Sequence, residues 1–415
     1  MSSEKKAFHY GWVIVVSCFM IMCFALCLVM NCLGLFVKPV TEDLGMSRQA
    51  FSMNSTMISV AMMAVSLFSG RIFGGSNQKN LRRIMAFATV GLSGSYALYS
   101  LASTPAVFYG ISLAVGVFLA LIAQVPCSIL VNNWFRDKKG LAMGLVFMGS
   151  GVGGVVLNPI ISTLMGSVGW RMTYLVMAGI MFAAVMPCTF FLIRVTPEEK
   201  GLEPYGGYGV PVNAGAAPST GMTLKEARGD LRFWLLLLSV VMITGACVSV
   251  VQQLASYISD LGYSYEVSAL VSSASLGLMA VGKLAVGGMY DKLGARTSTF
   301  LCVLCGIFGI GLLSMAGSGV VFIGLFLVLF AVGCALTTVA YPIITTYLFG
   351  SRDYGSIYGI VNVANSIGTA IGSPIAAAIF DSQGSYIPAW YLDVGVFCAV
   401  LLVLAVMFRG KRTAG

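Results

Sequence analysis

The chain is built from long apolar runs that recur from one end to the other, separated by short polar gaps. A membrane-crossing helix needs roughly 20 mostly apolar residues to span about 30 Å of hydrocarbon. Of the 415 residues, 58% are hydrophobic and 9% are charged, whereas soluble domains carry about 25% charged residues. This pattern excludes a soluble domain with one anchor and predicts an all-α protein that crosses the membrane many times.

Twelve spans fit the pattern. The apolar run after Tyr10 has no small-residue cleavage site, so we interpret it as the first span and not as a signal peptide. The longest gap, 195–231, mixes Pro, Gly, Ala and charges, which is typical of a flexible linker. We expect an N-terminal six-helix bundle at 1–194 and a C-terminal one at 232–415. The predicted spans are 11–37, 51–73, 83–103, 106–134, 140–166, 171–194, 232–258, 266–289, 297–316, 319–348, 355–380 and 387–408.

The distribution of Lys and Arg predicts the orientation. When both termini and every second loop are assigned to one side, that side receives 20 of the 24 basic residues. The other side holds Lys38, Arg48 and Arg171, and Lys283 lies within a span. The positive side is normally cytoplasmic. Both termini and the linker are therefore predicted in the cytoplasm, with the protein multi-pass in the lipid bilayer of the plasma or inner membrane.

An internal repeat predicts two pseudo-symmetric halves. Residues 43–47 (DLGMS) align with 260–264 (DLGYS) at an offset of 217. A nearly constant offset along each half is hard to obtain by chance, and parallel halves are one of the repeat architectures of secondary transporters. At an offset of 215, Gly140, Gly144, Gly153, Pro159 and Gly169 align with Gly355, Gly359, Gly368, Pro374 and Gly384.

The loop between the eighth and ninth spans, 287–296, has the sequence GGMYDKLGAR. It resembles the cytoplasmic loop signature of the major facilitator superfamily. A glycine turn and an acid beside basic groups at a helix end make a breakable latch. In the first-half copy, 70–83, Gly74 replaces the acid, and we interpret that copy as a turn. The residues predicted to act in gating are Gly287, Asp291, Lys292, Gly294 and Arg296.

Other segments resemble a narrower branch of that family, the monocarboxylate transporter and oxalate/formate antiporter group. They are HYGW at 9–12, NWFRDKKGLA at 133–142, the Gly-rich stretch 144–154 and RFW at 232–234. The resemblance runs in order along essentially the whole chain. It implies the twelve-helix major facilitator fold and secondary active transport of a small organic anion by alternating access.

Lys283 is the basic residue that is left within a span. It precedes Asp291 by eight residues, which is about 12 Å along a helix, near the middle of the hydrocarbon. A cation there is costly and usually functional. The family places a cation, usually Arg, at this position to bind the substrate carboxylate. A Lys binds as a point charge without the fork of Arg. The alternative is a structural Lys that snorkels or pairs with a buried acid, for which Asp393 is the candidate.

The chain also departs from the family at three places. Proton-coupled monocarboxylate carriers have an acid where this chain has Met279. Oxalate carriers have a second cation where it has Val361, next to Asn362, and animal monocarboxylate carriers have a Lys where it has Asn31. One cation in place of two argues against a dicarboxylate. The resemblance therefore implies a monocarboxylate, moved by an antiporter or a symporter.

Polar residues at helical spacing are candidates to line the path. Ser272, Ser275, Met279 and Lys283 share one stripe. The polar face of the eleventh span, which runs from Tyr358 to Thr369, could equally join helices. The predicted substrate-binding residues are Lys283, Asn31, Gln124, Tyr358, Asn362, Asn365, Ser275, Met279 and Tyr341.

Other classes of function fit less well. The single His, the lack of clustered carboxylates and the lack of a Gly-Lys-Ser/Thr loop argue against an enzyme and against ATP-driven transport. The eleven Cys all lie in apolar segments as small hydrophobes, so we expect no metal or cofactor. We expect no binding of nucleic acid, because the basic residues behind the net charge of +9 form no long run. We also expect the protein to function as a monomer. The alternatives are an exporter of amphipathic or drug-like compounds and a non-transporting membrane sensor.

Overall fold

The computed structural model describes residues 9–46, 48–74, 80–206, 221–263 and 265–408. Across these ranges the backbone is almost entirely helical, with isolated bridges from Phe135 to Tyr205 and from Gly221 to Gly350. The middle of the predicted linker, 207–220, lies outside the described residues. The helices are α1 (Gly11–Ile21), a π-helical segment (Met22–Asn31), α2 (Leu33–Leu44), α3 (Arg48–Leu67), α4 (Ser69–Phe73), α5 (Leu81–Leu98), α6 (Pro105–Ile122), α7 (Gln124–Trp134), α8 (Lys139–Pro187), a second π-helical segment (Cys188–Leu192), α9 (Leu224–Gly229), α10 (Leu231–Asp260), α11 (Tyr265–Ser314), α12 (Val320–Cys334), α13 (Ala340–Phe349), α14 (Tyr354–Gln383) and α15 (Ile387–Met407), with 3-10 turns at Tyr99–Leu101, Pro197–Lys200, Ala316–Ser318 and Ala335–Thr337.

Membrane-crossing helices account for most of the described chain. Within it, nine helices are long and apolar enough to cross a membrane. Two of them contain a glycine with non-helical backbone, Gly169 in α8 and Gly294 in α11, and each glycine divides its helix into two spans. The shorter apolar helix Met53–Leu67 supplies one more span. The predicted all-α membrane fold with twelve transmembrane helices is confirmed.

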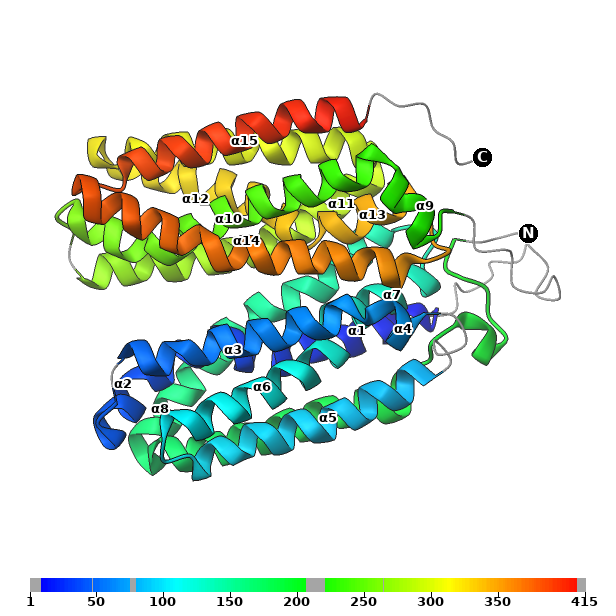
Figure 1. The fold of residues 1–415 in the computed structure, drawn as a ribbon, viewed down its shortest axis with the longest axis horizontal. Helices are drawn as coiled ribbons and strands as arrows, with labels where there is room; N and C mark the ends of the chain where they lie inside the picture. Colours follow the sequence, from blue (N-terminus) through cyan, green and yellow to red (C-terminus); the bar gives the residue numbers. More distant parts are fainter. Residues whose placement is uncertain (1–8, 47, 75–79, 207–220, 264, 409–415) are drawn as a thin grey trace, which may run out of the picture. The chain divides into compact units, whose positions relative to one another are not determined.

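The helices gather into two compact units. The described residues up to Val65 and from Arg71 to 206 form the first unit, and Ser66–Gly70 joins the residues from 221 onwards in the second. Within the first unit, α5 packs against α6 and α8. Within the second unit, α10 lies beside α14 and α15 (Figure 1).

Glycines permit the closest helix crossings inside each unit. A Cβ added to Gly153 of α8 would lie 2.7 Å from the backbone oxygen of Cys23, in the π-helical segment. A Cβ added to Gly368 of α14 would lie 2.5 Å from the backbone oxygen of Val241 in α10. These two glycines are among the pairs related by the offset of 215. Small residues at such crossings let helix backbones approach closely in a membrane, where packing drives helix association.

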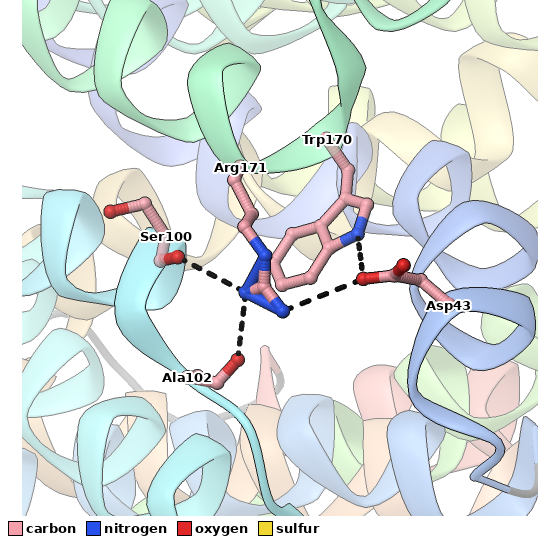
Figure 2. A network of polar contacts seen from close by, with 5 residues as sticks. All are labelled: Asp43, Ser100, Ala102, Trp170 and Arg171. Atoms are coloured by element: carbon pink, nitrogen blue, oxygen red, sulfur yellow. Dashed lines mark hydrogen bonds and ion pairs between the residues drawn. The ribbon is translucent and has the colours of Figure 1, made fainter.

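A polar clasp of Asp43, Trp170 and Arg171 ties together helix ends of the first unit (Figure 2). The indole nitrogen of Trp170 donates to Oδ2 of Asp43 at 3.0 Å, and the Arg171 guanidinium pairs with the same oxygen at 3.4 Å. Arg171 also donates to the backbone oxygens of Ser100 and Ala102, at 3.3 Å each. Because the ion pair is about half exposed, its charge attraction contributes only about 0–1 kcal/mol. The backbone contacts fix the connection between α5 and α6 to the break in α8.

Both described ends of the predicted linker are bound to the unit that they adjoin. In the first unit, the rings of His9 and Phe135 lie 5.4 and 5.6 Å from the ring of Tyr205. The HYGW and NWF segments therefore pack with the start of the linker, although more than a hundred residues separate them along the chain. In the second unit, the backbone nitrogen of Met222 donates to the oxygen of Phe349 at 2.8 Å.

Candidate functional site

Lys283 lies inside a membrane-spanning helix, away from its ends, in the part of α11 that packs against α12. Its side chain is half-buried. The neighbouring Gly282 permits the close crossing, because a Cβ there would lie 2.5 Å from the backbone oxygen of Ala331 in α12. Ala331 lies in the last turn of α12, which ends at Cys334, so the backbone of α11 next to Lys283 lies beside the end of α12.

The tenth span is broken directly after Cys334. We predicted one continuous span over 319–348, but α12 ends there, a 3-10 turn follows, and Thr338 has non-helical backbone angles, φ −128° and ψ −49°. Pro342 lies in the first turn of α13. It has no N–H to bond the carbonyl of Thr338, and its ring clashes with that carbonyl in a continuous helix. Since α11 packs against both the turn and α13, the break lies beside the helix that carries Lys283.

The first unit contains a break at the corresponding position. The helix predicted over 106–134 is divided at Ala123, where φ is −87° and ψ is −116°. Gln124, one of the predicted binding residues, begins α7, and Pro126 lies in its first turn. Ala123 and Thr338 are separated by 215 residues, the offset of the repeat. Broken helices at corresponding positions of two halves are a feature of transporter binding sites. The two prolines were the sequence signal that our prediction of continuous spans did not use.

A buried hydroxyl cluster joins three helices near the break in the second unit. The Thr244 hydroxyl on α10 donates to Oδ1 of Asn365 on α14 at 2.8 Å. The Tyr341 hydroxyl on α13 lies 3.3 Å from the Thr244 hydroxyl and 3.4 Å from the backbone oxygen of Val240. The structure thus brings the predicted residues Tyr341 and Asn365 together. Sequence analysis missed Thr244, because a lone Thr in an apolar helix gives little signal.

Other predicted residues of α14 have different surroundings. Tyr358 is 4% exposed and stacks on Tyr354, with ring centres 5.4 Å apart and planes within 8° of parallel. Asn362 is buried, and its amide nitrogen donates to the hydroxyl of Ser66 at 3.1 Å, within the second unit. The Asn362 amide is therefore bonded to the Ser66 side chain, whereas Asn365 belongs to the hydroxyl cluster.

The remaining predicted binding residues are distributed over both units. On α11, the buried Ser275 hydroxyl lies 4.0 Å from the sulfur of Met279, one turn before Lys283. Asn31 lies in the first unit at the end of the π-helical segment. Its amide nitrogen donates to the backbone oxygen of Ser150 on α8 at 3.0 Å.

The predicted gating loop lies at the break in α11. Gly294 has φ 77°, a left-handed backbone conformation that glycine adopts without steric cost. Asp291, Lys292 and Arg296 are exposed around this turn, while Gly287 is buried one turn before Asp291. The geometry provides the turn and the exposed charges that a latch requires.

Asp393, on α15, is a buried acid of the second unit. It is 6% exposed, and its carboxylate accepts a hydrogen bond from the Ser249 hydroxyl of α10 at 2.9 Å. Asp393 therefore joins α15 to α10 through this hydrogen bond.

Comparison with known proteins places these features in a family context. A family model described as Major Facilitator Superfamily matches residues 19–350. Human "Monocarboxylate transporter 12" is 24% identical over 97% of this chain and 82% of its own length. The "MFS-type transporter pytF" of Aspergillus terreus is 26% identical over 68% of this chain and 90% of its own length.

Solved structures share the fold at low sequence identity. The proton:xylose symporter XylE gives a TM-score of 0.70 at 11% identity, covering 96% of this chain and 95% of its own. The human organic anion transporter MFSD10 (TETRAN) gives 0.66 at 15% identity, covering 95% of this chain and 98% of its own. The predicted resemblance to the family is confirmed, and with it a multi-pass membrane transporter fold.

Proposed function

Because the chain belongs to the major facilitator superfamily, we propose that it moves a small organic anion with one carboxylate across the cytoplasmic membrane by alternating access. Lys283 carries the proposal. It lies within the membrane-spanning helix α11, which packs against the broken tenth span, including α13, the helix that carries Tyr341 of the hydroxyl cluster. An ammonium group in that setting attracts an anion strongly, because little water screens it.

One cation suits one carboxylate. A dicarboxylate would bring a second negative charge into a site whose proposed binding residues contain Lys283 as their cation. The substrate would therefore leave one charge without a partner, which is costly at membrane depth. The name of the human relative, monocarboxylate transporter 12, agrees with this class of substrate.

In the proposed transport cycle, an N-terminal bundle at 1–194 and a C-terminal bundle at 232–415, joined by the linker 195–231, rock and expose Lys283 to each side in turn. The excess of basic residues on one side supports a cytoplasmic location of both termini in this proposal. The protein works as a monomer in this proposal.

Uptake into proteoliposomes tests the proposal. We expect Lys283→Met, which retains the length of the side chain without its charge, to abolish monocarboxylate uptake. Lys283→Arg should retain part of it, because the charge remains. Lys225→Met removes an exposed Lys of α9 and should transport like the wild type. Undiminished uptake by Lys283→Met would refute the site, and transport of amphipathic compounds alone would favour the exporter.

A further inference from the structure

The hydroxyl cluster of the second unit has a fixed direction. A hydroxyl has one proton to donate, and a side-chain amide oxygen can only accept. The 2.8 Å contact to Oδ1 of Asn365 therefore uses the proton of Thr244. The Tyr341 hydroxyl can give its proton to Thr244 or to the backbone oxygen of Val240, and neither choice reverses the Thr244 bond. In both cases the Thr244 hydroxyl donates its proton to the amide oxygen of Asn365.

This direction decides which end of the Asn365 amide is available. The oxygen is engaged by Thr244, and in the part of the chain that the structure describes, the polar contacts of this side chain are those of that oxygen. Asn365 is half-buried, whereas Thr244 is 2% exposed and Tyr341 is 3% exposed. Two buried groups therefore orient a more accessible one, and the accessible end of Asn365 is its pair of N–H donors.

The hydroxyl cluster that orients these donors borders the helix that carries the cation. Tyr341 lies on α13, and α11, which carries Lys283, packs against α13 and against the 3-10 turn between α12 and α13. A carboxylate has two oxygens and about four lone-pair directions, while a Lys ammonium acts as a point charge without the planar fork of Arg. A carboxylate held by Lys283 thus retains acceptor capacity for a neutral donor such as an amide.

We propose that Thr244 is a positioning residue that holds the Asn365 amide with its N–H groups toward the transported anion, so that Lys283 and Asn365 together bind the two oxygens of one carboxylate. This inference rests on the proposed function. Removing the Thr244 hydroxyl frees the amide to turn its oxygen toward the anion, which converts a donor into a repelling dipole. Replacing the amide with a carboxylate, as in Asn365→Asp, would repel the anion by its negative charge.

The test measures binding of acetate, propionate and benzoate by their stabilisation of the purified full-length protein against heat, since a ligand of the folded state raises the melting temperature. The variants are Thr244→Val, which keeps the shape, Thr244→Ser, which keeps the hydroxyl, and Lys283→Met. With the acid that stabilises the wild type most, we expect the Kd of Thr244→Val to rise about tenfold. Thr244→Ser should remain within about twofold of the wild type.

The outcomes separate the two proposals. A Thr244→Val Kd equal to that of the wild type, with binding lost in Lys283→Met, overturns the positioning role alone. Normal binding by Lys283→Met, or no stabilisation of the wild type by any of the three acids, overturns the proposed function and this inference with it. A lower melting temperature of Thr244→Val without ligand, at unchanged Kd, assigns Thr244 a structural role and also refutes the inference.

Discussion

Replacing Gly153 with Ala should destabilise the first unit, whereas the same change at Gly154 should not. A Cβ on Gly153 would lie 2.7 Å from the backbone oxygen of Cys23 and 3.0 Å from the Cβ of Cys27. Real Cβ atoms essentially never come within 3.0 Å of a neighbour, and both of these neighbours belong to the π-helical segment. The segment or α8 must therefore shift by several tenths of an ångström. Forcing extra atoms into a packed interior costs about 1–3 kcal/mol.

Gly154 is a close control because it is the next residue of the same helix. A Cβ there would meet the sulfur of Cys27 at 3.9 Å, an ordinary contact distance. Both substitutions gain about 1 kcal/mol of helix propensity, so this gain cancels in the comparison. Gly153→Ala should therefore be less stable than Gly154→Ala by about 1–3 kcal/mol.

The assay is thermal unfolding of both variants in the same detergent, followed by the fraction that remains monodisperse after heating. We expect the midpoint of Gly153→Ala to fall several degrees below that of Gly154→Ala. Equal midpoints would refute the reasoning, because they would show that the crossing of α8 with the π-helical segment has room for a methyl group.

Two further predictions concern polar groups. Arg171→Lys keeps the charge of the clasp but loses the planar fork that contacts Ser100 and Ala102, so unfolding should become easier by about 1 kcal/mol, and an unchanged melting temperature would contradict this. Ser249→Ala removes the hydrogen bond to the buried Asp393 carboxylate and should cost about 1.5–3 kcal/mol. The matched change Ser239→Ala, which removes only a bond to a backbone oxygen within α10, should cost less in the same melting assay, and equal losses would contradict the role of Ser249.

Local sequence signals explain most of the fold prediction. Each span is visible because a membrane requires about 20 apolar residues, and the turn at Gly294 is visible because its glycine stands between charged residues. The breaks at Ala123 and Thr338 were missed, although each is followed by a proline three or four residues later, because both segments remain mostly apolar across the break. Hydropathy reports the length of a span and does not report its continuity.

Some site residues could likewise be predicted from the sequence, and the roles of others could not. Lys283 could be named from the sequence, because a charge inside an apolar run stands out against its neighbours. The role of Asn365 could not be separated from that of Asn362, since both lie on one face of α14 and differ only in what they contact. The sequence therefore predicted which residues are polar within the membrane, and the structure showed which partners they have.

The sequence alone determined a twelve-helix membrane protein of the major facilitator type, because apolar length, charge distribution and short motifs are properties of neighbouring residues. Only the tertiary structure decided how Thr244, Tyr341 and Asn365 meet, because the hydrogen bonds among them join helices about a hundred residues apart. Each of these contacts depends on how closely the helices cross. That distance is set by packing across the unit, which no single segment of sequence specifies.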